Sequence, residues 1–255
     1  MQLPEGYARL FVDGTPEPIG AVTTAVAAVL AGRVRERPDG YALPCDDLQQ
    51  ALDAAVERLR AAGLCPPPRG EAIAVRAGPD GAELGRVDRS AAEPLGLIVR
   101  KACLVGYLPG APVRVWLARR GKGQRTAPGL LDTMVAGGVA AGATLEETLA
   151  EEAREEASLA PERLRQARPA ARLDRVAPGP QGLSREDLHV WDLAMDPDER
   201  PVPRDPEIAG FTLMALPQLA EALVPAREFK PGAAIVLRDA LARWAAASTS
   251  SSGRA

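Results

Sequence analysis

The sequence predicts an α/β or α+β fold, and three observations lead to this prediction. Short runs rich in β-branched and alternating apolar residues predict strands, Ala-rich stretches with apolar residues three and four apart predict helices, and the two kinds of segment alternate along the chain. The chain has 255 residues, of which 46% are hydrophobic and 25% charged, which is ordinary for a globular protein with one large or two small domains.

Residues 1–110 are expected to form a small α+β N-terminal domain. Helices are predicted over 21–30 and 46–62, and the apolar side of the second helix is expected to pack on a small sheet of the same domain. A triplet of prolines at 66–68 ends the helical pattern. Strands are predicted to follow over 72–76 and 82–87.

Residues 111–247 are expected to form the second domain. Its pattern begins with strands, continues through a glycine loop into a helix at Leu145, and closes with helices. Residues 248–255 are rich in serine and are predicted to be a disordered tail. Strands are predicted over 99–108, 113–118, 132–138, 171–176, 188–194 and 207–213, a helix or loop over 161–169, and helices over 217–223 and 231–247.

The segment from Gly137 to Leu159, GGVAAGATLEETLAEEAREEASL, joins the glycine loop to an acidic helix. Thr144 is a favourable N-cap residue, and Glu147, three positions later, completes a capping box, so the helix should begin at about Leu145. On a helical wheel, one apolar stripe is expected to face the core; it consists of Leu145, Leu149, Ala153 and Ala157.

Three carboxylates, Glu152, Glu155 and Glu156, follow in the second half of this helix. Glu152 and Glu156 fall on the edge of the apolar stripe, where a carboxylate is costly unless a cation or hydrogen-bond donors compensate it. The three also repel one another at these spacings. A divalent cation would remove both costs, so the cluster suggests metal-assisted phosphate chemistry. A solvated acidic helix face is the alternative that the residues alone leave open.

This segment resembles the Nudix box, G-x5-E-x7-R-E-U-x-E-E-x-G-U, in which U is an aliphatic residue. The spacing is intact and the three glutamates are retained, whereas Ala143, Glu151 and Ser158 stand where the box has Glu, Arg and Gly. Flanking blocks extend the resemblance, over roughly residues 18–244, to the thiamine-pyrophosphokinase-related Nudix subfamily, which has its own N-terminal domain. These blocks lie at 18–20, 88–107, 116–138, 188–211 and 228–231.

The resemblance implies a fold and an activity. The fold would be a Nudix α/β/α sandwich with a mixed sheet, preceded by the small α+β domain. The activity would be hydrolysis of a diphosphate bond in a small organic diphosphate by a metal-activated water, with Mg²⁺ as the cofactor and Mn²⁺ as an alternative. A thiamine diphosphate derivative or a nucleoside diphosphate such as 8-oxo-dGDP is the implied substrate.

The resemblance also implies roles for individual residues. Glu152, Glu155 and Glu156 would hold the metal, and Glu155, Glu156 or Glu207 would orient or deprotonate the attacking water. The glycines of the loop would bind the substrate. Apart from the resemblance, the basic end of a preceding strand is the positive group nearest to this loop in the sequence and would bind the phosphates. The residues concerned are Gly137, Gly138, Arg119 and Arg120. Solvated charges are the alternative interpretation of Glu207 and of the two arginines.

The departures from the box keep two other function classes open. At Glu151, a glutamate would repel the neighbouring carboxylates where the box has an arginine that holds one of them. A degenerate Nudix domain could bind a nucleotide or a protein partner without turnover. The third class is a helix-rich interaction module in which the glutamates are ordinary solvated charges.

The composition and charge of the chain argue against several classes of protein. The net charge of -3 argues against a nucleic-acid polymer as partner, and no run of about 18 apolar residues predicts a membrane span. The start of the chain lacks the features of a signal peptide, so we expect a cytoplasmic protein. Cys45, Cys65 and Cys103 are expected to be reduced thiols in a core. A homodimer stays open.

Overall fold

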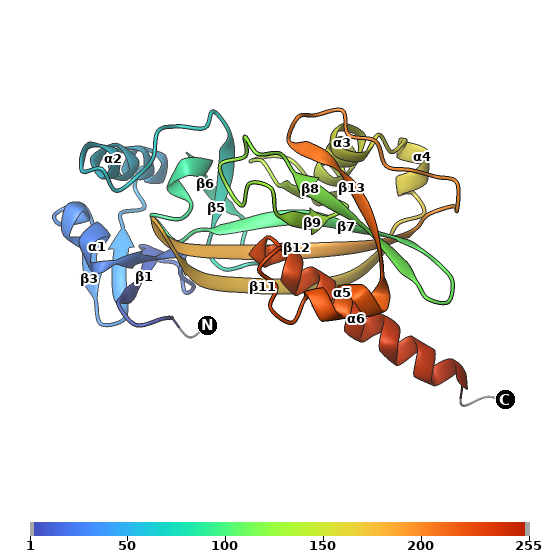
Figure 1. The fold of residues 1–255 in the computed structure, drawn as a ribbon. Helices are drawn as coiled ribbons and strands as arrows, with labels where there is room; N and C mark the ends of the chain where they lie inside the picture. Colours follow the sequence, from blue (N-terminus) through green and yellow to red (C-terminus); the bar gives the residue numbers. More distant parts are fainter. Residues whose placement is uncertain (1–2, 253–255) are drawn as a thin grey trace. The chain divides into compact units, whose positions relative to one another are not determined.

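The computed structural model describes residues 3–252, and the chain separates into two compact units (Figure 1). The first unit consists of Met1–Arg100, Val139–Ala143 and Asp174–Asp187, and the second of Lys101–Gly138, Thr144–Leu173 and Leu188–Ala255. Two short segments from the second half of the chain therefore belong to the first unit. Within residues 3–252, no helix has the length and apolar character that a membrane span requires.

The first unit contains a four-stranded sheet with the order β2-β1-β4-β3. Strand β1 (Tyr7–Val12) pairs antiparallel with β2 (Gly20–Thr23) and parallel with β4 (Gly40–Leu43), which pairs antiparallel with β3 (Arg35–Arg37). A separate hairpin joins β5 (Ala72–Arg76) to β6 (Glu83–Asp88), close to the two predicted strands. The strands β1, β3 and β4 were not predicted; β3 and β4, with three and four residues, are too short to show a period.

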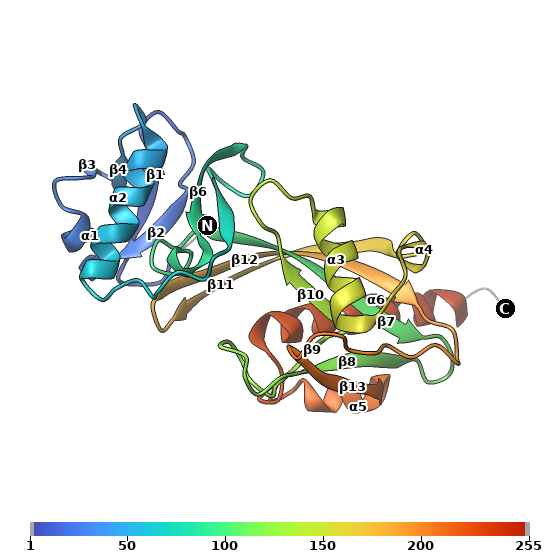
Figure 2. The same ribbon diagram turned by 90° about the horizontal axis from the view of Figure 1, so that it is seen from above.

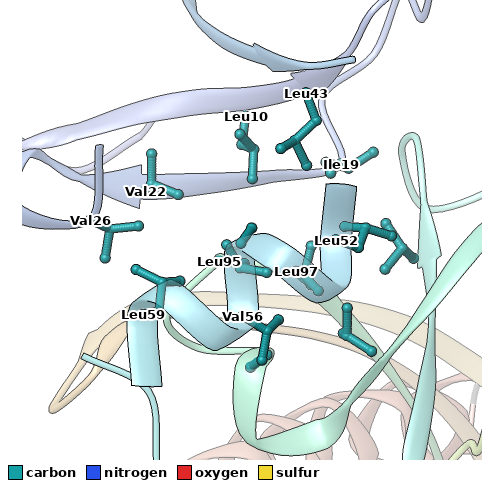
Figure 3. Close-up of a cluster of buried hydrophobic side chains, with 14 of the residues drawn as sticks. Leu10, Ile19, Val22, Val26, Leu43, Leu52, Val56, Leu59, Leu95 and Leu97 are labelled. Carbon is teal, nitrogen blue, oxygen red and sulfur yellow. The ribbon is translucent and has the colours of Figure 1, made fainter. Parts of the chain in front are cut away.

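Two helices of this unit, α1 (Thr24–Leu30) and α2 (Leu48–Ala61), begin at side-chain caps, Thr23 and Asp47. The prediction of α2 is confirmed, and its apolar side buries Leu52 and Leu59. Figure 3 shows the cluster in which these side chains pack with residues of the sheet and of the loop before β7. The helix predicted over 21–30 begins three residues late because residues 20–23 pair with β1.

The second unit is built around a seven-stranded sheet with the order β11-β12-β7-β8-β13, in which β10 also pairs with β7 and β9 with β8. The predicted strand over 132–138 is two strands, because the chain changes its pairing partner at Met134. The strands are β7 (Ile98–Leu108), β8 (Arg114–Arg120), β9 (Leu131–Thr133), β10 (Val135–Gly138), β11 (Arg168–Gly179), β12 (Gly182–Ala194) and β13 (Ile208–Ala215).

Helices cover both faces of this sheet (Figure 2). Because successive side chains of a strand point to opposite faces, β7 serves two cores. Ala102 and Leu104 belong to one cluster with residues of α3 (Leu145–Ala157). Cys103 and Val105 belong to another with residues of α5 (Leu216–Ala222) and α6 (Pro231–Ser252). This arrangement confirms the predicted α/β/α sandwich and the predicted α+β fold class.

Some details differ from the sequence predictions. Helix α6 extends to Ser252 rather than ending at 247, since serine and threonine are only modestly worse helix formers than alanine. The last three residues of the predicted tail, 253–255, lie outside the described part of the chain. Residues 161–169 contain the short helix α4 (Pro161–Leu164). Cys65 and Cys103 are buried as expected, but Cys45 is exposed, so the core prediction is wrong for that residue.

Candidate active site

Helix α3 begins where the sequence predicts, and the capping box explains why. The Glu147 backbone N–H donates to Thr144 Oγ1 at 3.1 Å, and the Thr144 backbone N–H donates to the Glu147 carboxylate at 2.9 Å. Leu149, Ala153 and Ala157 are buried, so the predicted stripe faces the core. The helix packs on β10, which fixes the side of α3 that carries its glutamates.

Gly137 leaves the space that the carboxylate of Glu152 occupies. A Cβ atom at this position would overlap Cγ, Cδ and Oε1 of Glu152. The reason for a glycine here is therefore close approach rather than an unusual backbone angle, since its φ lies outside the left-handed region. The Glu152 side chain is half-buried against the end of β10.

Glu156 is the most deeply buried carboxylate of the helix, with 6% of its surface exposed. The backbone N–H of Ala136 donates to its Oε2 at 2.9 Å, which ties the helix to β10. Burial, reinforced by the negative charge of Glu152, raises the pKa of Glu156 from 4.5 to about 8. A cation between the two carboxylates would reverse this effect.

Glu155 and Glu151 are placed differently. The carboxylate of Glu155 pairs with Arg154 at 2.5 Å, and both side chains are substantially exposed, at 41% and 52%. Glu151, at the position of the box arginine, is exposed and makes no ion pair with any residue that the structure describes. The structure thus brings Glu152 and Glu156 together and leaves Glu155 beside Arg154. Across residues 3–252, no three His, Cys, Asp or Glu side chains gather closely enough to hold a metal ion by themselves.

A buried ion pair lies close to Glu156. Lys230 Nζ lies 2.7 Å from Asp132 Oδ2, and Arg120 Nη1 lies 3.3 Å from the same oxygen. Burial alone would disfavour both charges, but Lys230 lowers the pKa of Asp132, and Asp132 raises the pKa of Lys230 above its ordinary value. The positive charge of Lys230 also favours ionisation of Glu156. The negative charge of Asp132 opposes this effect, so the ion pair as a whole does not replace the arginine that the box has at the position of Glu151.

The other predicted site residues lie in the strands and loops around the sheet. Arg120 is buried, and besides Asp132 it donates to Gln124 Oε1 and to the backbone oxygen of Thr126. Arg119 is exposed and donates to Gly129 O at 2.9 Å. Glu207 is exposed just before β13, and its side chain forms no hydrogen bond or ion pair with α3 in the described residues. Gly138 ends β10, next to Gly137.

Ser158, at the second glycine of the box, caps the C-terminus of α3 in the left-handed conformation that glycine prefers, with φ 56° and ψ 28°. Its hydroxyl donates to Val202 O at 2.6 Å and accepts a hydrogen bond from Arg204 Nε at 3.1 Å. These two bonds offset the strain of a residue with a Cβ atom in this conformation. The substitution at Ser158 therefore leaves the turn of the box intact.

Sequence reasoning missed Asp132 and Lys230. A signal was present, because Asp132 stands alone in the apolar run from Leu130 to Val135, and a charged residue in a core strand is buried only with a partner. The identity of that partner was not readable, since Lys230 lies 98 positions further along the chain.

Comparisons with known proteins agree with this geometry. The family model of the Nudix domain matches residues 105–238, which is more than half of the chain. Nudix hydrolase 20 of Arabidopsis thaliana, a chloroplastic protein, is 25% identical over 229 residues, covering 87% of this chain and 61% of the relative. An uncharacterized protein of Saccharomyces cerevisiae is 30% identical over 172 residues, covering 62% of this chain and 50% of the relative.

A crystal structure of a Deinococcus radiodurans protein has the same fold, with a TM-score of 0.51 and 23% identity, covering 66% of this chain and 98% of that one. The chain spans about half to three fifths of the length of the curated relatives. A helix-rich module without this domain is therefore wrong as an interpretation. The extent of the family match, together with the sandwich and the box, shows that the chain belongs to the Nudix domain family.

Proposed function

We propose that the chain is a hydrolase that cleaves a diphosphate bond in a small organic diphosphate. The observation that carries the proposal is the joint placement of Glu152 against Gly137 and of Glu156 against Ala136, which brings one half-buried and one buried carboxylate to the end of β10. Two of the relatives are named Nudix hydrolases, which supports the same activity.

The residues present fit a magnesium ion. Mg²⁺ is commonly held by one or two carboxylates, with waters and substrate phosphates completing six oxygen ligands, so a complete protein cage is not required. Glu152 and Glu156 would hold it, and Glu155 would join them after leaving Arg154; Mn²⁺ is an alternative with the same oxygen preference. When bound, the ion lowers the pKa of a coordinated water and neutralises charge on the phosphate oxygens.

The remaining steps belong to the chain itself. The backbone N–H of Ala136 orients Glu156, and Glu155, Glu156 or Glu207 would accept the proton of the attacking water. The exposed guanidinium of Arg119 and the backbone of Gly137 and Gly138 would bind substrate phosphates. Arg120 would contribute directly only by leaving its present partners; as placed, it holds Asp132.

The finer assignment is also proposed. A thiamine diphosphate derivative or an oxidised nucleoside diphosphate is the substrate that the subfamily resemblance favours, with residues 111–247 as the hydrolase domain and 1–110 as the domain of the thiamine-pyrophosphokinase-related type. The cytoplasmic location and a homodimer stay predictions.

The test is a Mg²⁺-dependent assay of phosphate release. The substrates are thiamine diphosphate, dGDP, 8-oxo-dGDP, ADP-ribose and NADH. Cleavage of ADP-ribose or NADH gives phosphate monoesters and no free phosphate, so for these two a coupled phosphatase releases phosphate from the products. We expect Glu152→Gln and Glu156→Gln to lower kcat on the preferred substrate by about a hundredfold, since the loss of a group that only orients a metal ligand already costs about tenfold to a hundredfold. Glu146→Gln, an exposed glutamate of the same helix, is the matched control and should retain kcat.

A second candidate function is binding without turnover. The ion pair of Glu155 with Arg154 and the exposed Glu151 favour it, because neither arrangement supports a three-carboxylate metal site. Absence of turnover on every substrate, with ligand-induced thermal stabilisation that is the same in wild type and both Gln variants, would establish this candidate and reject the hydrolase. Turnover that disappears in the two variants would reject the binder.

A further inference from the structure

The first unit contains a cavity of about 530 Å³ formed entirely by residues of that unit. This volume is in the range that takes a small organic ligand. Its walls come from β1, the loop between β1 and β2, the loop after β5, the start of β7, and the parts of β11 and β12 that belong to the first unit. None of its lining residues belongs to the Nudix box.

Arg185 of β12 lines this cavity and is the unusual group in it. Only 8% of its surface is exposed, and its Nη1 donates to Gly96 O at 3.3 Å, which is long for such a bond. Its Nε is buried and has no hydrogen-bond partner in the part of the chain that the structure describes. A buried guanidinium with donors left over is unfavourable unless an acceptor completes its surroundings.

The neighbouring charged residues do not supply the acceptor that the guanidinium of Arg185 needs. Burial lowers the pKa of Arg185, and the negative charge of Asp174 opposes this effect without reversing it. Arg175, the next arginine of the cavity, is already engaged with Ser184 Oγ at 2.8 Å and Glu186 at 3.3 Å. Donors therefore remain at Arg185, which lies deepest among these side chains.

The rest of the lining restricts what could bind. Pro18, Ile98 and Val176 present apolar surface, which suits a ring or an aliphatic body. Acidic residues such as Glu17 and Asp174 also line the cavity and would repel a ligand with several separate anionic groups. One anionic group beside an apolar body satisfies both restrictions.

We propose that this cavity binds a small organic molecule in which an apolar body carries a single carboxylate or phosphate monoester, with the guanidinium of Arg185 as the anchor of the anionic group. A planar guanidinium recognises either oxyanion through paired hydrogen bonds. The site is separate from the glutamates of α3, so it stands whether or not the proposed hydrolysis occurs.

The experiment is calorimetric titration of the full chain with benzoate and with phenyl phosphate, in EDTA so that no divalent ion can recruit phosphate to α3. Benzyl alcohol is the neutral probe. We expect at least one anion to bind at least tenfold more tightly than benzyl alcohol, and the tighter anion identifies the oxyanion class. Arg185→Met should weaken it at least tenfold, whereas Arg33→Met, at an exposed arginine of the same unit, should not change it.

Two further variants keep the result decisive. Val176→Asp places a negative charge at the cavity without removing a buried group, and should weaken anion binding as strongly as Arg185→Met; Leu84→Asp, at a similarly exposed position of this unit, is its control. Glu152→Gln should leave binding unchanged. Failure of both anions to bind, binding that survives both cavity variants, or binding lost in Glu152→Gln would each overturn the proposal.

Discussion

Arg120 in the second unit and Arg185 in the first are equally buried, each with 8% of its surface exposed, but they have different partners. Arg120 contacts the carboxylate of Asp132, which also pairs with Lys230 at 2.7 Å. Arg185 has a long bond to one backbone oxygen and a buried Nε without a partner in the described residues. The difference therefore lies in compensation and not in depth.

This comparison separates two uses of a buried charge. Every charge of the Asp132 group has a partner within the chain. The group therefore holds neighbouring residues in place, and removing one partner should lower the stability of the fold strongly. Arg185 is incomplete, so removing it should cost little and a ligand could complete it. Glu156 lies between these cases, with one backbone donor, a nearby Lys230 and a repelling Glu152.

The largest expected effect on stability comes from breaking the ion pair of Asp132 and Lys230. Lys230→Met leaves the carboxylate of Asp132 with the longer ion pair to Arg120 and the backbone N–H of Thr133, and should lower the free energy of unfolding by about 3 to 5 kcal/mol in urea titrations. The double variant Asp132→Asn/Lys230→Met should recover much of this loss, since no carboxylate is then left unpaired. Lys122→Met, at an exposed lysine, is the control. A double-variant loss equal to the sum of the single losses would contradict the pairing.

The next largest effect concerns Glu156, whose contribution to the stability of the fold depends on pH. The folded chain keeps the proton of Glu156 up to about pH 8, whereas the unfolded chain loses it near 4.5. Without Mg²⁺, stability should therefore be greatest below this window and fall as pH rises through it, by a few kcal/mol in total. Glu156→Gln should lack the decline, and Mg²⁺ should reduce it in the wild type. Parallel pH profiles for wild type and variant in EDTA would refute this assignment.

A smaller effect is expected for the incomplete group. In the absence of ligand, Arg185→Met should leave the free energy of unfolding unchanged or raise it by about 1 kcal/mol, because an apolar side chain replaces a poorly compensated charge. Chemical unfolding of the two proteins side by side measures this. A loss above about 2 kcal/mol would mean that the chain itself holds the guanidinium, and would remove the contrast with Arg120.

The smallest effect concerns an exposed pair. Arg154→Ala should change the free energy of unfolding by less than about 0.5 kcal/mol, since both side chains of the Arg154–Glu155 pair face solvent. The same variant releases Glu155, so Mg²⁺ affinity measured by calorimetry should not fall. A destabilisation as large as that of Lys230→Met would show that exposure does not separate the two pairs.

Much of the fold was readable because local patterns determine it. Helices α2 and α3 carry caps and apolar stripes over three or more turns, and both begin within two residues of the prediction. The strands β1, β3 and β4 were missed: β3 and β4 are too short to show a period, and β1 pairs in parallel with β4, which lies beyond α1 in the sequence. The division of 132–138 into two strands at Met134 was also missed, because the local sequence does not indicate that its first part pairs with β8 and its second part with β7.

The site followed the same division. The sequence by itself determined the capping box, the spacing of Glu152, Glu155 and Glu156, and the glycine before them, because these are properties of one continuous segment. Only the tertiary structure decided that Glu156 is buried, that Glu155 pairs with Arg154, and that the Nε of Arg185 has no hydrogen-bond partner in the described residues. Burial and charge compensation depend on which distant segments meet, and no local pattern contains that information.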